Sequence, residues 1–185
     1  MKGTRRVSVI AAVAENGVIG RKGALPWRIP EDFRFYLGKV RDQIIILGRH
    51  CFYEADHPAA LTIALSRNPQ WQPSPLKSFV LPQSGGRRCM VARSLPEALQ
   101  LAQDFRFSTE QDQSTDKEIL VCGGAKVFEE AMPIATRLYL TRVHAEVEGD
   151  TFFPSDWRAH FPVLVSERPS ADPNYHYTFC IFEKA

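Results

Sequence analysis

The chain has 185 residues, of which 44% are hydrophobic and 24% are charged, as in an ordinary globular protein with a real core. The formal net charge of +2 argues against a general commitment to nucleic acids or membrane surfaces. No apolar run approaches the length of a membrane-spanning helix. The four cysteines form no CxxC pair and no zinc-ligand spacing, so we expect free thiols, a reducing compartment and no metal site.

A short basic tail, residues 1–6, precedes an apolar run at Val7–Ala14. Together they have the outline of a secretory signal, with Ala12-Val13-Ala14 in the place of a cleavage site. The run is short for a signal and also suits a strand buried on both faces. We interpret it as the first strand of a single domain over residues 7–185, because the next residues need this strand as a scaffold.

A loop with three glycines, residues 15–24, follows this strand and allows close approach to a ligand or movement. A helix is expected at Pro30–Val40, since proline is tolerated in a first helical turn and an apolar period follows it. Buried strands are expected at residues 43–47 and at Leu61–Leu65, with a helix through residues 51–55 between them.

Residues 68–88 are rich in proline and glycine and predict an irregular excursion with a short strand at 78–81. A strand at 89–92 precedes a helix at Leu95–Asp104, whose start is marked by a capping box of Ser94 and Glu97. A polar segment covers 108–117, a helix follows Gly123-Gly124-Ala125, and an acidic loop covers 146–154. Further strands are expected at 119–122, 137–145, 161–166 and 176–182, the last two spaced like a long hairpin.

This alternation of strands and helices predicts an α/β sandwich whose sheet is parallel at first and ends in an antiparallel pair. We find no internal repeat and no linker that would divide the chain.

One carboxylate stands out in the helix that starts at Pro30. Asp32 and Tyr36 are four residues apart and share a helix face, next to Phe33 and Leu37. Apolar surroundings raise the pKa of a carboxyl group, and a lone acid in an apolar cleft suits the binding and protonation of a basic heterocycle. The alternative interpretation is an ordinary first-turn acid favoured by the helix dipole.

Three turns that follow predicted strands each carry a cation: Gly48-Arg49-His50, Leu65-Ser66-Arg67 and Gly123-Gly124-Ala125-Lys126. Ligands of open α/β sheets bind at the carboxyl ends of strands, and glycines let backbone N–H groups approach a pyrophosphate. Arginine and lysine bind phosphate. The pattern predicts a phosphate-bearing cofactor, although GxGxxG and Walker A motifs are absent. For the last turn, the alternative is that the glycines only permit close packing of helix and strand. For His50, the alternative is an ordinary residue at the start of a helix.

Eight short motifs, in order along residues 7–182, resemble those of dihydrofolate reductase. They are Ile10-Ala11-Ala12, Val18-Ile19-Gly20, Leu25-Pro26-Trp27, Pro30-Glu31-Asp32, Leu47-Gly48-Arg49, Cys122-Gly123-Gly124-Ala125, Leu138-Tyr139-Leu140-Thr141 and Glu148-Gly149-Asp150-Thr151-Phe152-Phe153-Pro154. The resemblance implies a central, mostly parallel sheet of about eight strands with an antiparallel C-terminal strand and helices on both faces. It also implies reduction of dihydrofolate by NADPH, with hydride passing to C6 and a proton to N5.

The resemblance also implies roles for individual residues. Asp32 would hold the 2-amino and N3 edge of the pterin, Thr141 would support it, and Trp27 would fix a water beside Asp32. Other substrate contacts would come from Ile10, Phe33, Tyr36 and Cys122. Residues 15–24 would form a lid steadied by the loop of Asp150, and the nicotinamide would border Ala12, Val18, Ile19 and Gly20. The rest of the cofactor would contact Gly48, Arg49, His50, Cys51, Leu65, Ser66, Arg67, Arg93, Gly123, Gly124, Ala125, Lys126, Val127 and Phe128.

The sequence departs from the family at the substrate's glutamate tail. The family usually has an arginine that binds the tail's α-carboxylate, but no Arg or Lys lies between Arg49 and Arg67. The loss of such a bidentate contact costs about 2–3 kcal/mol of tail affinity. Other departures are Tyr36 for Phe, Cys51 for Thr, Lys126 for Arg and Phe128 for Tyr.

We therefore expect an NADPH-dependent dihydrofolate reductase that is monomeric and cytoplasmic, with a small pterin substrate and no nucleic-acid or membrane partner. Two alternatives stay open. One is a reductase of the same fold whose pterin or pyrimidine substrate lacks the glutamate tail. The other is a non-catalytic NADPH-binding protein.

Overall fold

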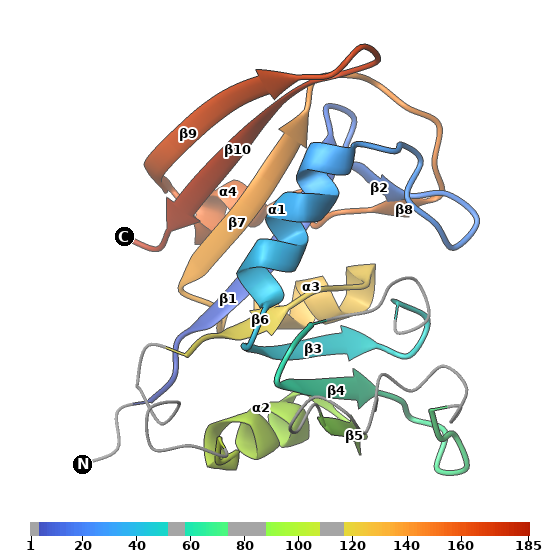
Figure 1. Ribbon diagram of the computed structural model, residues 1–185, viewed down its shortest axis with the longest axis vertical. Helices are drawn as coiled ribbons and strands as arrows, with labels where there is room; N and C mark the ends of the chain where they lie inside the picture. Colours follow the sequence, from blue (N-terminus) through green and yellow to red (C-terminus); the bar gives the residue numbers. More distant parts are fainter. Residues whose placement is uncertain (1–3, 52–57, 74–87, 108–116) are drawn as a thin grey trace.

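A computed structural model describes residues 4–51, 58–73, 88–107 and 117–185. They build an eight-stranded sheet in the order β5-β4-β3-β6-β1-β7-β10-β9 (Figure 1). The parallel strands are β1 (Val7–Ala14), β3 (Ile44–Gly48), β4 (Leu61–Leu65), β5 (Arg88–Ala92), β6 (Ile119–Val121) and β7 (Arg137–Val143). β10 (His176–Glu183) runs antiparallel to β7 and to β9 (Val163–Ala171). The predicted α/β class and the antiparallel C-terminal strand are confirmed.

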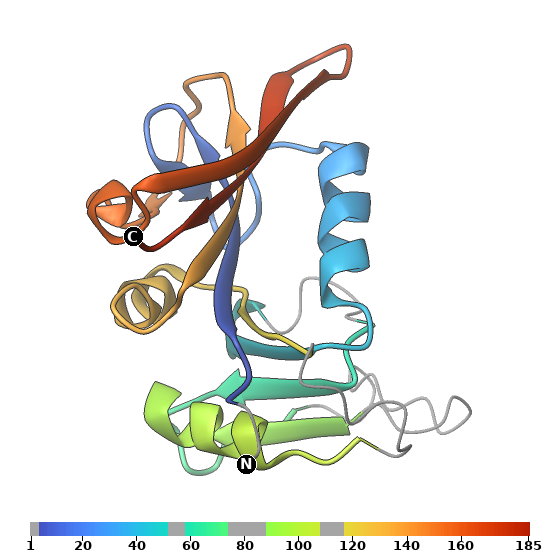
Figure 2. The same ribbon diagram turned by 90° about the vertical axis from the view of Figure 1, so that its left-hand side faces the viewer.

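Helices cover both faces of this sheet, as expected. α1 (Pro30–Val40) lies on one face, and α2 (Leu95–Asp104), α3 (Ala125–Ala131) and α4 (Trp157–His160) lie on the other (Figure 2). Because side chains alternate along a strand, Ile44 and Ile46 of β3 pack in the cluster that contains α2 and α3, while Ile45 and Leu47 pack toward α1. None of the helices in these described segments is long and apolar enough to span a membrane.

The helix starts agree with the sequence-based expectations. α1 has proline in its first turn. At α2, the Ser94 side chain accepts a hydrogen bond from the Glu97 N–H. The Glu97 carboxylate reaches back one residue further than a capping box requires, to the N–H of Arg93 at 2.6 Å.

Short elements escaped prediction because they are too short to show a period. β2 (Val18–Gly20) pairs with β8 (Thr151–Phe152) in a separate two-stranded sheet, inside segments expected to be loops. The short helix α4 was also missed. The expected helix after residue 51, the strand at 78–81 and most of the polar segment at 108–117 lie outside the described residues.

The C-terminal hairpin is real, but its first strand was placed too early. β9 starts at Val163 and continues to Ala171, through Arg168, Pro169 and Ser170. Proline is tolerated there because β9 is an edge strand. Phe161 was expected to start this strand. It is instead fully buried in the core between the sheet and the helices α2 and α3.

Two arginines from the basic N-terminal segment make defined contacts. The Arg5 guanidinium donates to the carbonyl oxygens of Ala102 at 2.7 Å, Gln103 at 2.9 Å and Phe105 at 3.0 Å. The first two carbonyls belong to the last turn of α2 and the third belongs to its C-cap residue, and carbonyl groups at a helix end lack partners within the helix. Arg5 therefore caps α2 across a long sequence distance.

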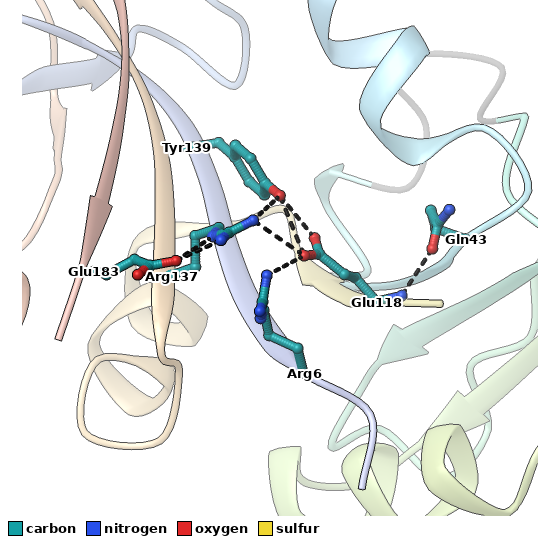
Figure 3. A network of polar contacts seen from close by, with 6 residues as sticks. All are labelled: Arg6, Gln43, Glu118, Arg137, Tyr139 and Glu183. Atoms are coloured by element: carbon teal, nitrogen blue, oxygen red, sulfur yellow. Dashed lines mark hydrogen bonds and ion pairs between the residues drawn. The ribbon is translucent and has the colours of Figure 1, made fainter. Parts of the chain in front are cut away.

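Arg6 joins a network at the amino ends of β6 and β7 (Figure 3). The Glu118 carboxylate accepts hydrogen bonds from Arg6 at 3.2 Å and from the Tyr139 hydroxyl at 3.0 Å. Arg137 lies 3.7 Å from Glu118 and also pairs with Glu183 at the end of β10. The network links β1, β6, β7 and β10 at the edge opposite to the carboxyl ends of the parallel strands.

The two-stranded sheet is packed tightly against the loop before β8. The Asp150 N–H donates to the Gly20 carbonyl at 3.0 Å, and the Lys22 N–H donates to the Asp150 carboxylate at 2.9 Å. A Cβ atom on Gly149 would lie 2.6 Å from the Gly20 carbonyl oxygen and closer still to Val18. A side chain at position 149 is therefore excluded unless β2 moves.

We predict that Gly149→Ala destabilises the protein by about 1–3 kcal/mol, because the added methyl group overpacks the contact with β2. Gly38→Ala is the matched control: Gly38 lies in α1, and a Cβ there meets nothing within 4 Å. It should stabilise the protein by about 0.5–1 kcal/mol, the usual penalty of a helical glycine. Urea unfolding measures both changes, and a Gly149→Ala protein as stable as the wild type would contradict the packing described here.

Candidate active site

A cleft of about 830 Å³ opens where the carboxyl ends of the parallel strands meet α1 and the segment that carries β2. It gathers predicted site residues from distant parts of the chain. The predicted residues in its lining are Ile10, Ala12, Ile19, Gly20, Trp27, Asp32, Phe33, Tyr36, His50, Cys51, Cys122, Gly123, Gly124, Phe128 and Thr141.

The Asp32 carboxylate is held in this cleft by a strand residue. The Thr141 hydroxyl, on β7, donates a hydrogen bond of 2.6 Å to Asp32 Oδ1. Burial raises the pKa of the Asp32 carboxyl, the Thr141 hydrogen bond opposes that rise, and the negative charge of Glu31 adds to it. Asp32 therefore has a higher affinity for a proton than an exposed aspartate, which suits acid–base chemistry.

The walls beside Asp32 are mostly apolar. Phe33 and Leu25 are 48% and 52% exposed, and both line the cleft, so their apolar surface is available to a flat ring. Sequence reasoning missed Leu25, Leu47 and Thr151 as cleft residues. The position of Leu47 directly before the Gly48 turn was the available signal, whereas Thr151 reaches the cleft only through the unpredicted β2–β8 pairing.

Trp27 lines the same cleft as Asp32 and has an unsatisfied donor. Its side chain is buried, and among the described residues no protein atom accepts a hydrogen bond from the indole Nε1. A buried donor without an acceptor is costly, so this position favours an ordered polar partner in the cleft.

The turns after β3, β4 and β6 lie side by side and are joined by backbone hydrogen bonds. The Gly48 N–H donates to the Gly123 carbonyl at 2.8 Å, and the Arg49 N–H donates to the Leu65 carbonyl at 3.0 Å. Gly123 has φ of +125°, and a Cβ there would meet the Cys51 sulfur and the Phe128 ring at 3.5 Å. The positive φ explains why glycine stands at position 123, because the contacts that a Cβ would make there are of ordinary van der Waals length. The predicted row of turns is therefore present at one edge of the sheet.

The predicted cofactor residues outside the cleft lining are distributed along this row or behind it. Val18 is almost fully buried in the cluster around Ala14 and Trp27. The Arg93 guanidinium donates to the carbonyls of Ser66 at 3.1 Å, Asn68 at 2.7 Å and Pro69 at 3.2 Å, so it braces the segment after β4. The others outside the lining are Gly48, Arg49, Leu65, Ser66, Arg67, Ala125, Lys126 and Val127.

The cleft also contains two cysteines. Burial raises the pKa of the Cys122 thiol to about 12, although a hydrogen bond with Tyr36 opposes that rise. The neutral Cys122 thiol is a poor nucleophile and serves as a small packing group.

Comparisons with known proteins point to one family. The family model for dihydrofolate reductase matches residues 6–184. Dihydrofolate reductase type 3 of Salmonella typhimurium is 33% identical over 150 residues, which cover 80% of this chain and 78% of the relative. The dihydrofolate reductase of Neisseria gonorrhoeae is 32% identical over 188 residues, 94% of this chain and 95% of the relative.

Structural comparison agrees with the sequence matches. A solved structure of dihydrofolate reductase from Enterococcus faecalis, complexed with NADP(H) and RAB-propyl, aligns with a TM-score of 0.74 and 28% identity. The alignment covers 97% of this chain and 96% of the other. The resemblance seen in the eight motifs thus extends over nearly the whole fold, and the chain belongs to the dihydrofolate reductase family.

Proposed function

We propose that this enzyme reduces 7,8-dihydrofolate to tetrahydrofolate, with hydride delivered to C6 and a proton to N5. The observation that carries this proposal is the Asp32 carboxylate, held by Thr141 in an apolar cleft that also contains the Gly123-Gly124 turn. One cleft thus offers an acid for a pterin and a glycine turn for a phosphate-bearing cofactor.

Asp32 and Thr141 are the groups suited to hold the pterin. A carboxylate accepts two parallel hydrogen bonds, which matches the adjacent 2-amino and N3 donors of the ring. Ile10 and Phe33, with Tyr36, provide the apolar surface on which the ring would lie. This arrangement fixes the ring's orientation, and the raised proton affinity of Asp32 favours protonation of the bound heterocycle.

The cofactor assignment rests on the fit of the residues at the strand ends. NADPH, when bound, supplies the hydride. The glycines of the 123–124 turn leave backbone room beside Cys51, and His50 lines the same cleft. Arg49, Arg67 and Lys126 belong to neighbouring turns and provide positive charge for phosphates. The dihydrofolate reductase from Enterococcus faecalis named above was solved with NADP(H), which supports this choice.

The nicotinamide end of the cofactor would lie against Ala12, Ile19 and Gly20, which line the cleft near Asp32. Residues 15–24 would cover it as a lid that excludes water during hydride transfer. The contact of Asp150 with Lys22 supports this role, because it ties the segment to the loop before β8. The unsatisfied indole donor of Trp27 supports its assignment as the residue that orients a water near Asp32.

We predict that Asp32→Asn lowers turnover at pH 7 by about 100-fold or more, because the amide neither takes up a proton nor accepts both hydrogen bonds. Wild-type kcat/KM should fall as pH rises through the raised pKa of Asp32, since the protonated form is then lost. The decrease in NADPH absorbance with dihydrofolate present measures both the turnover of the variant and the pH profile of the wild type. Asp42→Asn is the control, because Asp42 is exposed and its φ of 57° suits asparagine. Wild-type turnover in Asp32→Asn would remove the assignment.

One observation favours a second candidate, a substrate without the glutamate tail. No Arg or Lys lies between Arg49 and Arg67, and the described part of that stretch places Pro58 and Ala59 in the interior. The position where the family usually supplies a carboxylate clamp therefore offers no cation.

Comparison of kcat/KM for dihydrofolate and for a tail-less dihydropterin tests this second candidate. A clamp worth about 2–3 kcal/mol corresponds to a preference of roughly 30- to 140-fold for dihydrofolate. If the clamp is missing and unreplaced, we expect a ratio well below that range. A preference within it or above it would discard the tail-less version and would require a cation from elsewhere in the protein.

A further inference from the structure

The carboxylate of Glu31, the residue before Asp32, accepts hydrogen bonds from distant residues that no local sequence pattern predicts. Its Oε2 accepts hydrogen bonds from the Ser170 hydroxyl at 2.6 Å and the Tyr177 hydroxyl at 2.7 Å. Its Oε1 accepts one from Arg168 at 3.0 Å. All these donors belong to the β9–β10 hairpin, more than 130 residues along the chain.

This attachment holds a helix start that has no cap of its own. The N-cap residue of α1 is Ile29, which makes no side-chain capping hydrogen bond. The first turn of α1 is therefore fixed by tertiary contacts. The Glu31 cluster provides these contacts, and in the next turn of the helix the Phe35 ring packs against Phe179 with ring centroids 4.7 Å apart.

The donors to Glu31 are themselves rigidly placed. Tyr177 is 1% exposed, and it lies directly opposite Ser170 across the hairpin. The Arg168 guanidinium lies over the Phe179 ring at 4.5 Å, and these two residues are also direct cross-strand partners. The hairpin thus positions these donors through strand pairing and, for the largely exposed Arg168, through its contact with the Phe179 ring.

The strand register connects this set to Asp32. Thr141, Phe179 and Arg168 face one another across β7, β10 and β9, so they form one row on one face of the sheet. Thr141 at one end of the row binds Asp32, and Arg168 at the other end binds Glu31. Two successive residues of α1 are therefore held by the two ends of the same cross-strand row.

The pKa values of the two neighbouring acids are shifted in opposite directions. The hydrogen bonds from Ser170, Tyr177 and Arg168 lower the pKa of the Glu31 carboxyl to about 2, so Glu31 stays charged at every working pH. That permanent charge adds to the rise in the pKa of Asp32. The other titratable or charged groups that line the cleft are Arg28, Arg34, Tyr36, His50, Cys51 and Cys122.

From this geometry we infer that Glu31 is a positioning residue for the proposed reduction. It anchors the first turn of α1 to the β9–β10 hairpin, and it keeps a fixed negative charge beside the acid that meets the pterin. The inference rests on the proposed role of Asp32.

Two substitutions at position 31 separate charge from reach. Glu31→Gln keeps the length of the side chain but removes its charge, whereas Glu31→Asp keeps the charge but shortens the reach to the hairpin donors. Glu167→Gln is the matched control, because Glu167 is an exposed acid of β9 whose neighbour Arg168 points to the opposite face of the sheet. Two readouts apply to each variant: the pH profile of kcat/KM, and the titration of the Asp32 carboxyl followed by carbon NMR.

For Glu31→Gln we expect the Asp32 titration and the descending limb of kcat/KM to move down by about 0.5–1 pH unit. At a pH above the limb this shift lowers kcat/KM about three- to tenfold, because less of the protonated acid remains. For Glu31→Asp we expect an Asp32 titration close to the wild type and a KM raised about three- to tenfold by the lost hydrogen bonds. Glu167→Gln should match the wild type in both readouts.

Tyr177→Phe provides a second route if a variant at position 31 does not fold. It retains the Glu31 charge and removes one donor, so it should raise KM without moving the Asp32 titration. A wild-type Asp32 titration in Glu31→Gln together with a wild-type KM in Glu31→Asp would overturn the inference. Where those variants do not fold, a wild-type KM in Tyr177→Phe would overturn it. The proposed function has a separate test, because wild-type turnover in Asp32→Asn would contradict it. The two failures are distinguishable, since the Asp32 titration is measured by NMR and needs no turnover.

Discussion

The hydrogen bond between Asp32 and Thr141 joins α1 to β7 of the sheet, and the proposed chemistry of the cleft depends on it. A carboxylate among apolar side chains is unfavourable unless donors satisfy it, and burial then favours its protonated form. Thr141 supplies one donor and so limits the rise in pKa without cancelling it. The Asp32 carboxyl therefore has a higher pKa than an exposed aspartate, which supports its proposed role in protonating a basic heterocycle.

Glu31 shows how neighbouring acids on one helix turn acquire different properties. Both side chains belong to the first turn of α1, so their intrinsic pKa values are similar and the helix dipole acts on both. Glu31 receives hydroxyl and guanidinium donors and stays ionised, whereas Asp32 faces the cleft with a single hydroxyl donor from β7. Such a separation of pKa values by environment is the usual way in which a protein assigns different roles to two carboxylates.

The sequence was informative where local patterns decide the structure. Proline at position 30, the Ser94 cap and the Ile-rich run of β3 each predict an element from neighbouring residues. The β2–β8 pairing, the Arg5 cap and the Glu31 cluster depend on partners that are distant in the sequence, which no local period reveals. The predicted strand ends at residue 166, before Arg168 and Ser170, which bind Glu31 in the structure.

The placement of charge supports the proposed site for a polyanionic cofactor in a chain whose net charge is only +2. Arg5, Arg6 and Arg137 are committed to helix carbonyls or to carboxylates away from the strand ends that form the cleft, and Arg168 is paired with Glu31. Within the described segments, Arg49, Arg67 and Lys126 take part in no such ion pair and stand on the turns after β3, β4 and β6. Net charge therefore says little about affinity here, because local positive potential depends on which cations the fold leaves uncompensated at one edge of the sheet.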